Sequence, residues 1–421
     1  MRSNLNRKNL HFIIRASIAV FITYLSMYAF RKPFTAAQFQ NKQMWGIDFK
    51  ILLIITQLIG YTISKYFGIK IISELTPQKR TITLIILMTT AWLSLLCFAL
   101  VPIPYNLPFM FLNGLPLGMI WGVVFSYIEG RKDTELLGAV MASSFIVSSG
   151  IVKGAGSYLL VNLNVSEIWM PFITGLIFLP ILILGIYLLN SLSVPSNEDK
   201  EFRTERIPMQ KNERKAFYKS FAPGIIFSVI IYVCLTIFRD LRDNFAVEFW
   251  YSIGIKNIPT MLVVSEIPIA LLVILLIALT ILIKNNKKAF FVNFYIVIMG
   301  AILLLISTLF FYKNIITATS WMIIAGFSLY FPYIAYHAVF FERWIAYFKI
   351  KSNIGFLMHV ADAAGYCGST LVLLFKNFNH IHYSWVNFFI YSAFITSTII
   401  IIFSIFNYTY FIKLNKIQKY D

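Results

Sequence analysis

Charged residues are scarce in this sequence. Asp, Glu, Lys and Arg together make up 13% of its 421 residues, whereas hydrophobic residues make up 59%. An average globular domain contains roughly 25% charged residues. A soluble protein of this length could not cover its surface with so few, so the composition excludes an ordinary soluble domain and indicates a polytopic membrane protein.

Other classes are excluded by what else is rare. Three cysteines without a CxxC pair cannot form a disulfide framework. Only 20 Gly and 14 Pro exclude a collagen-like fibre, while 40 Phe and 23 Tyr are too many for a disordered chain. No ATP-binding motif is present to indicate a pump.

The net charge of +18 does not indicate nucleic-acid binding. The 36 Lys and Arg lie mainly between apolar segments. No zinc-ligand spacing, glycine-rich phosphate loop or basic helix with interleaved aromatics accompanies them in the sequence. We therefore expect no nucleic-acid partner, no metal and no cofactor.

Twelve apolar stretches are each long enough to cross a bilayer, whose core of about 30 Å needs about 20 helical residues. They lie at 12–38, 50–69, 81–100, 107–128, 136–160, 167–190, 221–245, 259–283, 288–311, 319–341, 353–375 and 384–412. The longest polar interruption, 196–219, divides them six and six. The sequence therefore predicts an all-α polytopic membrane protein with an N-terminal six-helix bundle (1–190), a cytoplasmic central loop (191–220) and a C-terminal six-helix bundle (221–421).

The basic residues predict the orientation of the spans, because loops retained in the cytoplasm are enriched in Lys and Arg. Counted over alternate loops, 24 basic residues lie on one side and five on the other. Both termini and the central loop are therefore expected in the cytoplasm. The first span lacks a short apolar core followed by a small-residue cleavage site, so we expect it to be retained. The Ile-, Lys-, Asn- and Phe-rich composition fits a bacterial inner (plasma) membrane.

The first helices of the two halves share a pattern. Tyr24 is followed seven residues later by Arg31, and Tyr232 is followed seven residues later by Arg239. Seven residues make about two helical turns, so the Tyr and Arg of each half lie on nearly one face. Repeats of this kind are typical of transporters whose substrate site lies near the membrane midplane.

Short motifs in five spans follow one another in order: Tyr28-Ala-Phe-Arg31-Lys32-Pro-Phe, Gly60-Tyr61-Thr-Ile-Ser64-Lys65, Phe111-Leu-Asn113-Gly with Trp121-Gly, Tyr330-Phe-Pro, and Gly365-Tyr366-Cys-Gly. With these motifs the chain resembles the organophosphate:phosphate antiporters of the major facilitator superfamily. That family includes the glycerol-3-phosphate and hexose-phosphate transporters. The resemblance implies a major-facilitator-like fold of twelve transmembrane helices.

The same resemblance implies a site in which one arginine from each half grips a phosphate, helped by a span-two lysine and several tyrosines. Carried to the matching positions, the implied substrate-binding residues are Arg31, Arg239, Lys65, Tyr24, Tyr28, Tyr61, Asn113, Tyr330 and Tyr366. The expected protein is not an enzyme but a monomeric secondary active transporter in the lipid bilayer. Its expected cargo is a small organic anion, preferably a phosphorylated metabolite, moved by antiport and alternating access.

The sequence departs from that family's pattern in several places. The family's span-five His-Asn pair, expected within 143–150, is absent, and Lys153 follows one turn later. Pro33 replaces an Asn, and the stretch 239–243 is more charged than the family's span seven. Asp362 stands where the family's span eleven is usually apolar. These departures leave the substrate and its exchange for phosphate open.

Arginine suits the implied role because its guanidinium donates paired hydrogen bonds to two oxygens of a phosphate. Carboxylates and sulfonates would fit nearly as well. The alternative is that Arg31 and Arg239 reach from the outer interface to the headgroups. Lys65 and Lys153 would add positive potential to a central cavity; for them the alternatives are snorkelling or an ion pair with a carboxylate.

A further set of polar residues is predicted to gate or couple transport: Lys32, Lys153, Arg242, Asp243 and Asp362. Asp243 could pair with Lys32 or Arg31 across the pore, or it could only neutralise neighbouring arginines. A polar set lies within the later spans: Glu266, His337, Glu342, His359 and Asp362. His359 and Asp362 lie three residues apart on one helix face. A proton relay could use this set, or its members could be packing or interface residues.

Two other functions remain open from the sequence. A transporter-like membrane receptor would sense a phosphorylated metabolite, although the short central loop and tails offer little docking surface. A polytopic transferase would normally show clustered carboxylates or His on an external loop. A counterflow assay in liposomes separates a transporter from a receptor, because a receptor binds its ligand without moving it.

Overall fold

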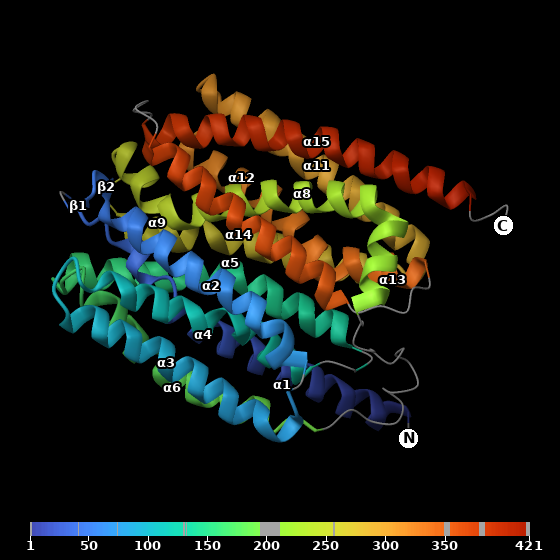
Figure 1. Cartoon of the computed structure of the whole chain (residues 1–421), viewed down its shortest axis with the longest axis horizontal. Helices are drawn as coiled ribbons and strands as arrows, with labels where there is room; N and C mark the ends of the chain where they lie inside the picture. Colours follow the sequence, from blue (N-terminus) through green and yellow to red (C-terminus); the bar gives the residue numbers. More distant parts are fainter. Residues whose placement is uncertain are drawn as a thin grey trace. The chain divides into compact units, whose positions relative to one another are not determined.

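The structure is a computed structural model that describes residues 2–40, 42–73, 75–128, 131, 133–193, 211–255, 257–348, 354–378 and 384–417. Nearly all of these residues are helical (Figure 1). Within them, 11 helices are long and apolar enough to cross a membrane. The remaining expected span, 353–375, coincides with α14 (Ile354–Phe378). The predicted all-α, multi-pass architecture is confirmed.

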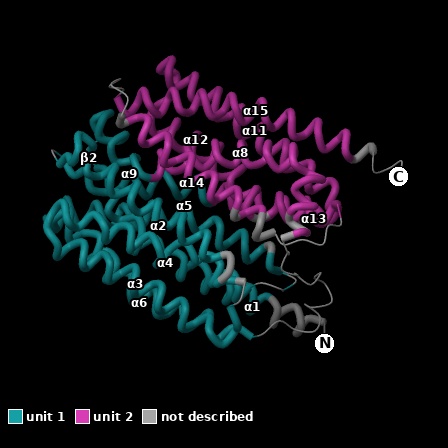
Figure 2. The backbone as a smooth tube through the Cα atoms, in the orientation of Figure 1, with its two compact units in different colours: residues 1–205, 244–270 teal, residues 206–243, 271–421 magenta. Residues whose placement is uncertain are grey.

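The chain forms two compact units, coloured separately in Figure 2. Unit 1 contains residues 1–205 and 244–270, and unit 2 contains residues 206–243 and 271–421. Part of the central loop expected at 191–220 lies outside the described residues. The last part of that range belongs to the helix α8 (Lys211–Ser252). The expected boundaries 1–190 and 221–421 follow chain order, whereas the units follow contacts and place 244–270 in unit 1.

Unit 1 is built on packed helix pairs. Its elements are α1 (Arg2–Ala29), η1 (Pro33–Ala36), β1 (Gln43–Met44), β2 (Ile47–Asp48), α2 (Phe49–Ser73), η2 (Pro77–Lys79), α3 (Arg80–Leu100), α4 (Leu107–Ser126), α5 (Thr134–Asn162), α6 (Met170–Asn190) and α9 (Ile258–Val264). Helix α4 packs against α2 and α3, α1 packs against α5 and α6, and α5 packs against α9. The short strands form an antiparallel hairpin that the sequence analysis did not predict.

Helices α2 and α4 approach closely because glycines face the neighbouring backbone. A Cβ atom at Gly114 would lie 2.2 Å from the carbonyl oxygen of Gln57, and one at Gly118 would lie 2.7 Å from that of Tyr61. No larger side chain fits at such a contact. This close approach fixes the position of α2 along α4, and with it the positions of Tyr61 and Lys65.

The first predicted span, 12–38, is not one helix. Helix α1 ends at Ala29, and a 3-10 helix begins at Pro33. A proline in the interior of a helix has no N–H to donate and clashes with the carbonyl four residues earlier, so the α-helix ends before it. Arg31 therefore lies in a buried turn rather than on a regular helix.

Unit 2 contains most of α8, part of α10 (Glu266–Ile281), α11 (Asn286–Tyr312), α12 (Ala318–Ala335), a π-helical turn η3 (Tyr336–Phe340), α13 (Phe341–Tyr347), α14 and α15 (Trp385–Ile417). Helix α11 packs against α12 and α15. The ring of Phe290 on α11 contacts the rings of Phe340, Trp344 and Phe411, which builds an aromatic core for this unit.

Helices α8 and α14 also meet through glycines. A Cβ atom at Gly365 would lie 2.8 Å from the hydroxyl oxygen of Thr236, and one at Gly368 would lie 2.8 Å from a methyl carbon of Val233. Span eight, predicted as one helix at 259–283, is broken at Ser265 between α9 and α10. Span ten, predicted at 319–341, continues through η3 and α13 to Tyr347.

Candidate functional site

Unit 1 holds two basic side chains on one buried tyrosine. The guanidinium carbon of Arg31 lies 4.1 Å from the centre of the Tyr61 ring, and the Lys65 Nζ atom lies 5.4 Å from it. All three side chains are buried. Tyr61 and Lys65 are four residues apart on α2, so the helix places them one turn apart. The structure thus brings together three of the predicted substrate-binding residues.

The turn that carries Arg31 is held by two side-chain amides. Where α1 ends, its last carbonyl groups lose their helical partners. Gln57 Nε2 donates to the Arg31 carbonyl at 2.9 Å, and Asn113 Nδ2 donates to the Phe30 carbonyl at 2.9 Å. Gln57 Nε2 also donates to Asn113 Oδ1 at 2.7 Å, and Asn113 Nδ2 reaches the Ala91 carbonyl at 2.8 Å.

These contacts bear on the expected role of Asn113. The oxygen and the nitrogen of its side-chain amide both form hydrogen bonds with protein atoms. This favours a role in holding the turn over a role in binding substrate directly. Gln57, its partner, was missed by the sequence analysis. The signal for it was a lone amide within the apolar span 50–69, where a polar group needs a partner.

Tyr24 and Tyr28 lie together in an aromatic cluster on α1. Their ring centres are 5.8 Å apart, and both contact Phe145 of α5, at 5.0 and 6.1 Å. Tyr24 also meets the ring of Trp121 edge-on at 5.4 Å. Their part in substrate binding stays a prediction.

Acidic residues are absent from the sequences of α1, α2 and α4. Carboxylates reach unit 1 through the end of α8 and the start of α10: Glu248 forms an ion pair with buried Lys50, and Glu266 is buried. Lys32 donates to Asn244 Oδ1 at 2.8 Å, next to the predicted gating residue Asp243. Lys153, also a predicted gating residue, is buried within α5.

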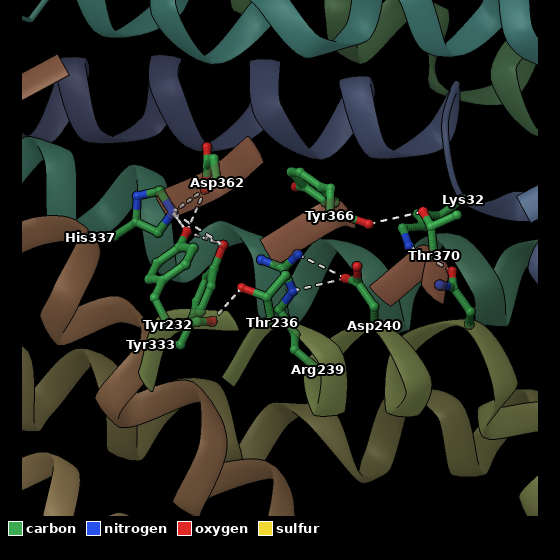
Figure 3. A network of polar contacts seen from close by, with 11 residues as sticks. Lys32, Tyr232, Thr236, Arg239, Asp240, Tyr333, His337, Asp362, Tyr366 and Thr370 are labelled. Carbon is green, nitrogen blue, oxygen red and sulfur yellow. Dashed lines mark hydrogen bonds and ion pairs between the residues drawn. The ribbon is translucent and has the colours of Figure 1, made fainter. Parts of the chain in front are cut away.

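Unit 2 holds Arg239 in a different setting (Figure 3). Its guanidinium lies 4.4 Å from the ring centre of Tyr333 and 5.6 Å from that of Tyr366. Two of its nitrogens, Nε and Nη2, donate to Asp240 Oδ1 at 3.1 and 2.8 Å. The pairing of Arg239 with a carboxylate of its own helix, one of the alternatives the sequence left open, is present in the structure.

A second polar cluster lies beside this ion pair and contains Tyr232, Tyr333, His337 and Asp362 (Figure 3). The Tyr232 hydroxyl donates to Asp362 Oδ1 and lies 2.6 Å from His337 Nε2. The Tyr333 hydroxyl lies 3.1 Å from both the Tyr232 hydroxyl and His337 Nε2. His337 Nε2 lies 3.5 Å from Asp362 Oδ1. We call these four side chains the Asp362 cluster.

The sequence analysis predicted only part of this cluster. It placed Asp362, His337 and His359 in one polar set. His337 lies beside Asp362 in the structure, and the side chain of His359 lies outside the described part of the chain. The two hydroxyls, from Tyr232 and Tyr333, were not predicted. Only Tyr232 could have been singled out from the sequence, because it belongs to the repeat in which a tyrosine precedes an arginine by seven residues.

Two further predicted residues of unit 2 lie near each other, and a third, Asp243, is buried on α8. Arg242 Nη2 donates to the carbonyl of Met322 at 3.3 Å, and its guanidinium lies 5.7 Å from the ring centre of Tyr330. Both side chains are buried. In the described residues, no three His, Cys, Asp or Glu side chains are grouped closely enough to hold a metal ion.

Comparison with solved structures identifies the fold. A mutant of the nucleoside transporter NupG aligns with a TM-score of 0.61 and 12% sequence identity, over 94% of this chain and 98% of that one. A D-xylose-proton symporter aligns with a TM-score of 0.59 and 15% identity, over 94% and 96%. The predicted major-facilitator-like fold is confirmed.

Sequence comparison gives a family. No curated protein matches the chain. A family model, described as a family of unknown function (DUF5690), matches residues 33–414, which include every predicted site residue except Tyr24, Tyr28, Arg31 and Lys32. The chain therefore belongs to the DUF5690 family.

Proposed function

We propose that this protein is a secondary active transporter that moves a small organic anion, preferably a phosphorylated metabolite, by alternating access. The observation that carries the proposal is the pair of buried cations, Arg31 and Lys65, on the ring of Tyr61. The proposal assigns the substrate's anionic group to these two side chains. Arg239 of unit 2 stays a predicted substrate-binding residue.

The energetic argument starts from the cost of a charge in a membrane. A basic side chain at the centre of a membrane helix costs about 2.5–3.5 kcal/mol on insertion scales. Arg31 and Lys65 lie on segments whose sequences carry no acidic residue. An anionic substrate offsets this cost, and the offset favours whichever state of the transporter holds the substrate.

The choice of a phosphoryl group follows from the shape of arginine. A guanidinium presents its N–H groups as a planar fork that matches two oxygens of one phosphate, while a lysine adds a point charge. One arginine and one lysine on a common ring can therefore hold two different edges of a tetrahedral anion. The face of Tyr61 keeps both cations in place before the anion arrives.

The fold supports transport. Both structural neighbours are described as transporters of small molecules, a nucleoside in one case and D-xylose with a proton in the other. Their low identity to this chain leaves the cargo to be argued from its own residues, which favour an anion. We further propose that the protein is a monomer in a bacterial inner membrane, with both termini in the cytoplasm, on the strength of the charge asymmetry between its loops.

A counterflow and binding experiment tests the proposal. Purified wild-type protein is screened by thermal stabilisation against phosphorylated and carboxylated metabolites, and those that stabilise it are used for counterflow in liposomes. Stabilisation and counterflow by phosphates, both lost in Arg31→Gln, are the expected result. Arg15→Gln is the matched control, because Arg15 lies on α1, the helix just before the turn that carries Arg31, and is exposed.

Two outcomes contradict the proposal. If Arg31→Gln responds to phosphates as the wild type does, Arg31 does not bind the substrate. If phosphates stabilise the wild type but show no counterflow, the protein binds without transporting and is a receptor.

A further inference from the structure

Helices α8 and α14 of unit 2 run side by side in the same direction (Figure 3). The Tyr232 hydroxyl on α8 donates to Asp362 on α14. One turn later Thr236 lies against Gly365, where a Cβ atom would come within 2.8 Å of the Thr236 hydroxyl oxygen. Residues three or four apart share one face of a helix, so these two contacts are successive layers of one helix pair.

The next layer of this helix pair contains Asp240 and Ser369. Asp240 is four residues after Thr236, and Ser369 is four residues after Gly365, so each continues the face of its own helix. Both residues are buried, with 4% and 2% of their surface exposed. A carboxylate and a hydroxyl group therefore lie at one level of the contact between α8 and α14.

Each of these two side chains has an oxygen that makes no hydrogen bond to the described protein. Asp240 Oδ1 accepts from Nε and Nη2 of Arg239, but no hydrogen bond reaches Asp240 Oδ2 from any described residue. The Ser369 hydroxyl likewise has no hydrogen-bond partner in this part of the chain. Buried polar groups are nearly always hydrogen-bonded, so two such oxygens at one level favour a ligand that bonds to both.

Other hydroxyl groups on these helices bond to their own backbone. Thr236 donates to the Tyr232 carbonyl at 2.8 Å, and Thr370 donates to the Tyr366 carbonyl at 2.9 Å. A serine or threonine within a helix can ordinarily satisfy its hydroxyl in this way. Ser369, the neighbour of Thr370, makes no such bond, which favours a partner from outside its own helix.

The chemistry of the two oxygens selects a neutral hydroxyl group. An alcohol can donate to Asp240 Oδ2 and accept from the Ser369 hydroxyl at the same time. An ionised phosphate or carboxylate oxygen has no hydrogen to donate, and the Asp240 carboxylate repels it. An ammonium group is not favoured either, because Arg239 already neutralises Asp240 through their ion pair.

We propose that Asp240 and Ser369 form a subsite that binds a hydroxyl group of the transported molecule. The subsite rests on the function proposed above and narrows it, because the cargo then carries a hydroxyl group besides its anionic group. Arg239 positions Asp240 by holding Oδ1, which leaves Oδ2 for the ligand. Binding at the subsite needs no proton transfer and no covalent step.

The expected effect is a preference for cargo that carries the hydroxyl group. A hydrogen bond to a charged group changes affinity about 10- to 100-fold, and one between neutral groups about 2- to 10-fold. We therefore expect a hydroxylated cargo to bind about 10- to 100-fold more tightly than the same molecule without hydroxyl groups. A site built to bond a hydroxyl rejects the analogue that lacks it, because its own polar groups are then left unpaired.

Thermal stabilisation of the purified full chain tests this preference with matched probes. Glycerol 3-phosphate is compared with propyl phosphate, and glycerate with propanoate, so that the members of each pair differ only in hydroxyl groups. D-xylose is added as a probe that has hydroxyl groups and no charge. The wild type is expected to bind the hydroxylated member of each anion pair more tightly.

Three variants assign the preference to the subsite. Ser369→Ala removes a hydroxyl with no partner in the described protein, so it should keep the unfolding temperature and lower the preference about 2- to 10-fold. Thr370→Val is the matched control and should keep the preference, because its hydroxyl bonds to its own helix. Arg239→Gln with Asp240→Asn replaces the charged acceptor by a neutral one without leaving a charge unpaired, and should lower the preference about tenfold.

The preference is a ratio of two affinities, so a loss of affinity for the anionic group common to both probes does not change it. Equal affinities in the wild type, or a preference that Ser369→Ala keeps in full, overturn the subsite and leave anion transport intact. Gel filtration checks that each variant is folded, and Ser369→Ala decides the question if the double variant is not.

The subsite and the proposed function fail differently. If no anion binds the wild type, the proposed function fails and D-xylose decides the subsite. Stabilisation by D-xylose that Ser369→Ala loses and Thr370→Val keeps supports the subsite, and any other result with D-xylose then overturns it.

Discussion

The two units place an arginine at the same position of a repeated pattern but surround it differently. In unit 1, Arg31 lies on Tyr61 beside a second cation, and α1, α2 and α4 carry no acidic residue. In unit 2, Arg239 lies on Tyr333 and forms an ion pair with Asp240. One sequence repeat therefore holds two arginines with different contacts, one beside a lysine on a tyrosine ring and the other in an ion pair with a carboxylate.

The tyrosines that precede these arginines show the same divergence. Tyr24 packs among aromatic rings, whereas Tyr232 takes part in a buried hydrogen-bonded cluster with Asp362. The equivalent tyrosines of the repeat therefore make different kinds of contact in the two units. Changes made in parallel in both units can test how far the two arginine sites differ.

The largest difference is expected when each arginine is neutralised. Arg239→Gln leaves Asp240 buried without its partner, which for a buried ion pair costs about 3–5 kcal/mol of stability. Arg31→Gln removes the contact with the Tyr61 ring, which as a cation–π contact is worth about 0.5–2 kcal/mol, so a smaller loss is expected. Unfolding in detergent measures both. Adding Asp240→Asn to Arg239→Gln should recover much of the loss, and equal losses in the two single variants would break the comparison.

The next difference concerns the glycine contacts that position the two sites. A methyl group at Gly114 would lie 2.2 Å from a backbone oxygen, whereas one at Gly365 would lie 2.8 Å from the side-chain oxygen of Thr236. Overpacking costs about 1–3 kcal/mol, and backbone yields less than a side chain. Gly114→Ala is therefore expected to lower the unfolding temperature more than Gly365→Ala. The reverse order would show that α2 and α4 can separate easily.

Removing the amide beneath Arg31 should have a moderate effect. Gln57→Leu leaves the Arg31 carbonyl and Asn113 Oδ1 without the hydrogen bonds they now accept, and a buried group left in this way costs about 1–3 kcal/mol. Anion affinity should fall together with stability, because the turn that carries Arg31 is loosened. Titration of the stabilising anion measures the affinity, and Thr62→Val is the control on the same helix. Unchanged affinity would mean that the turn is held by other contacts.

The smallest effect is expected from the tyrosine rings. Tyr61→Leu removes the face on which Arg31 and Lys65 lie and should weaken anion binding by about 0.5–2 kcal/mol, the range of a cation–π contact. Tyr61→Phe keeps the face and should bind almost as the wild type does. Tyr333→Phe, the parallel change in unit 2, keeps the ring beside Arg239 but removes a hydroxyl that lies 3.1 Å from the Tyr232 hydroxyl and from His337 Nε2, so it should lower stability instead. Anion titration and thermal unfolding distinguish the two responses.

The broad fold could be predicted from the sequence because hydropathy and loop charge act over whole spans. Apolar stretches placed the helices within a few residues in most cases, and the motifs around Arg31 and Lys65 correctly implied that they lie near Tyr61. The resemblance to organophosphate antiporters supplied that grouping; periodicity alone could not connect α1 with α2.

The finer features depended on local backbone geometry. Hydropathy did not predict that α1 ends at Ala29, although Pro33 in the sequence indicates a helix end nearby. The π-helical turn that carries His337 was not predicted, and neither was the contact of His337 with Asp362, which joins two elements. The pairing of Asn113 with Gln57 required the contact of α2 with α4 to be known.

The break at the end of α1 has a consequence for how Arg31 can move. A residue within a helix shifts only if the whole rod shifts or unwinds. Arg31 instead lies in a short turn whose carbonyl groups accept hydrogen bonds from two side-chain amides, those of Gln57 and Asn113. Under the proposed function, a change of partners in these two hydrogen bonds would let the Arg31 side chain move with a bound substrate. The helix α1 before the turn would not have to move.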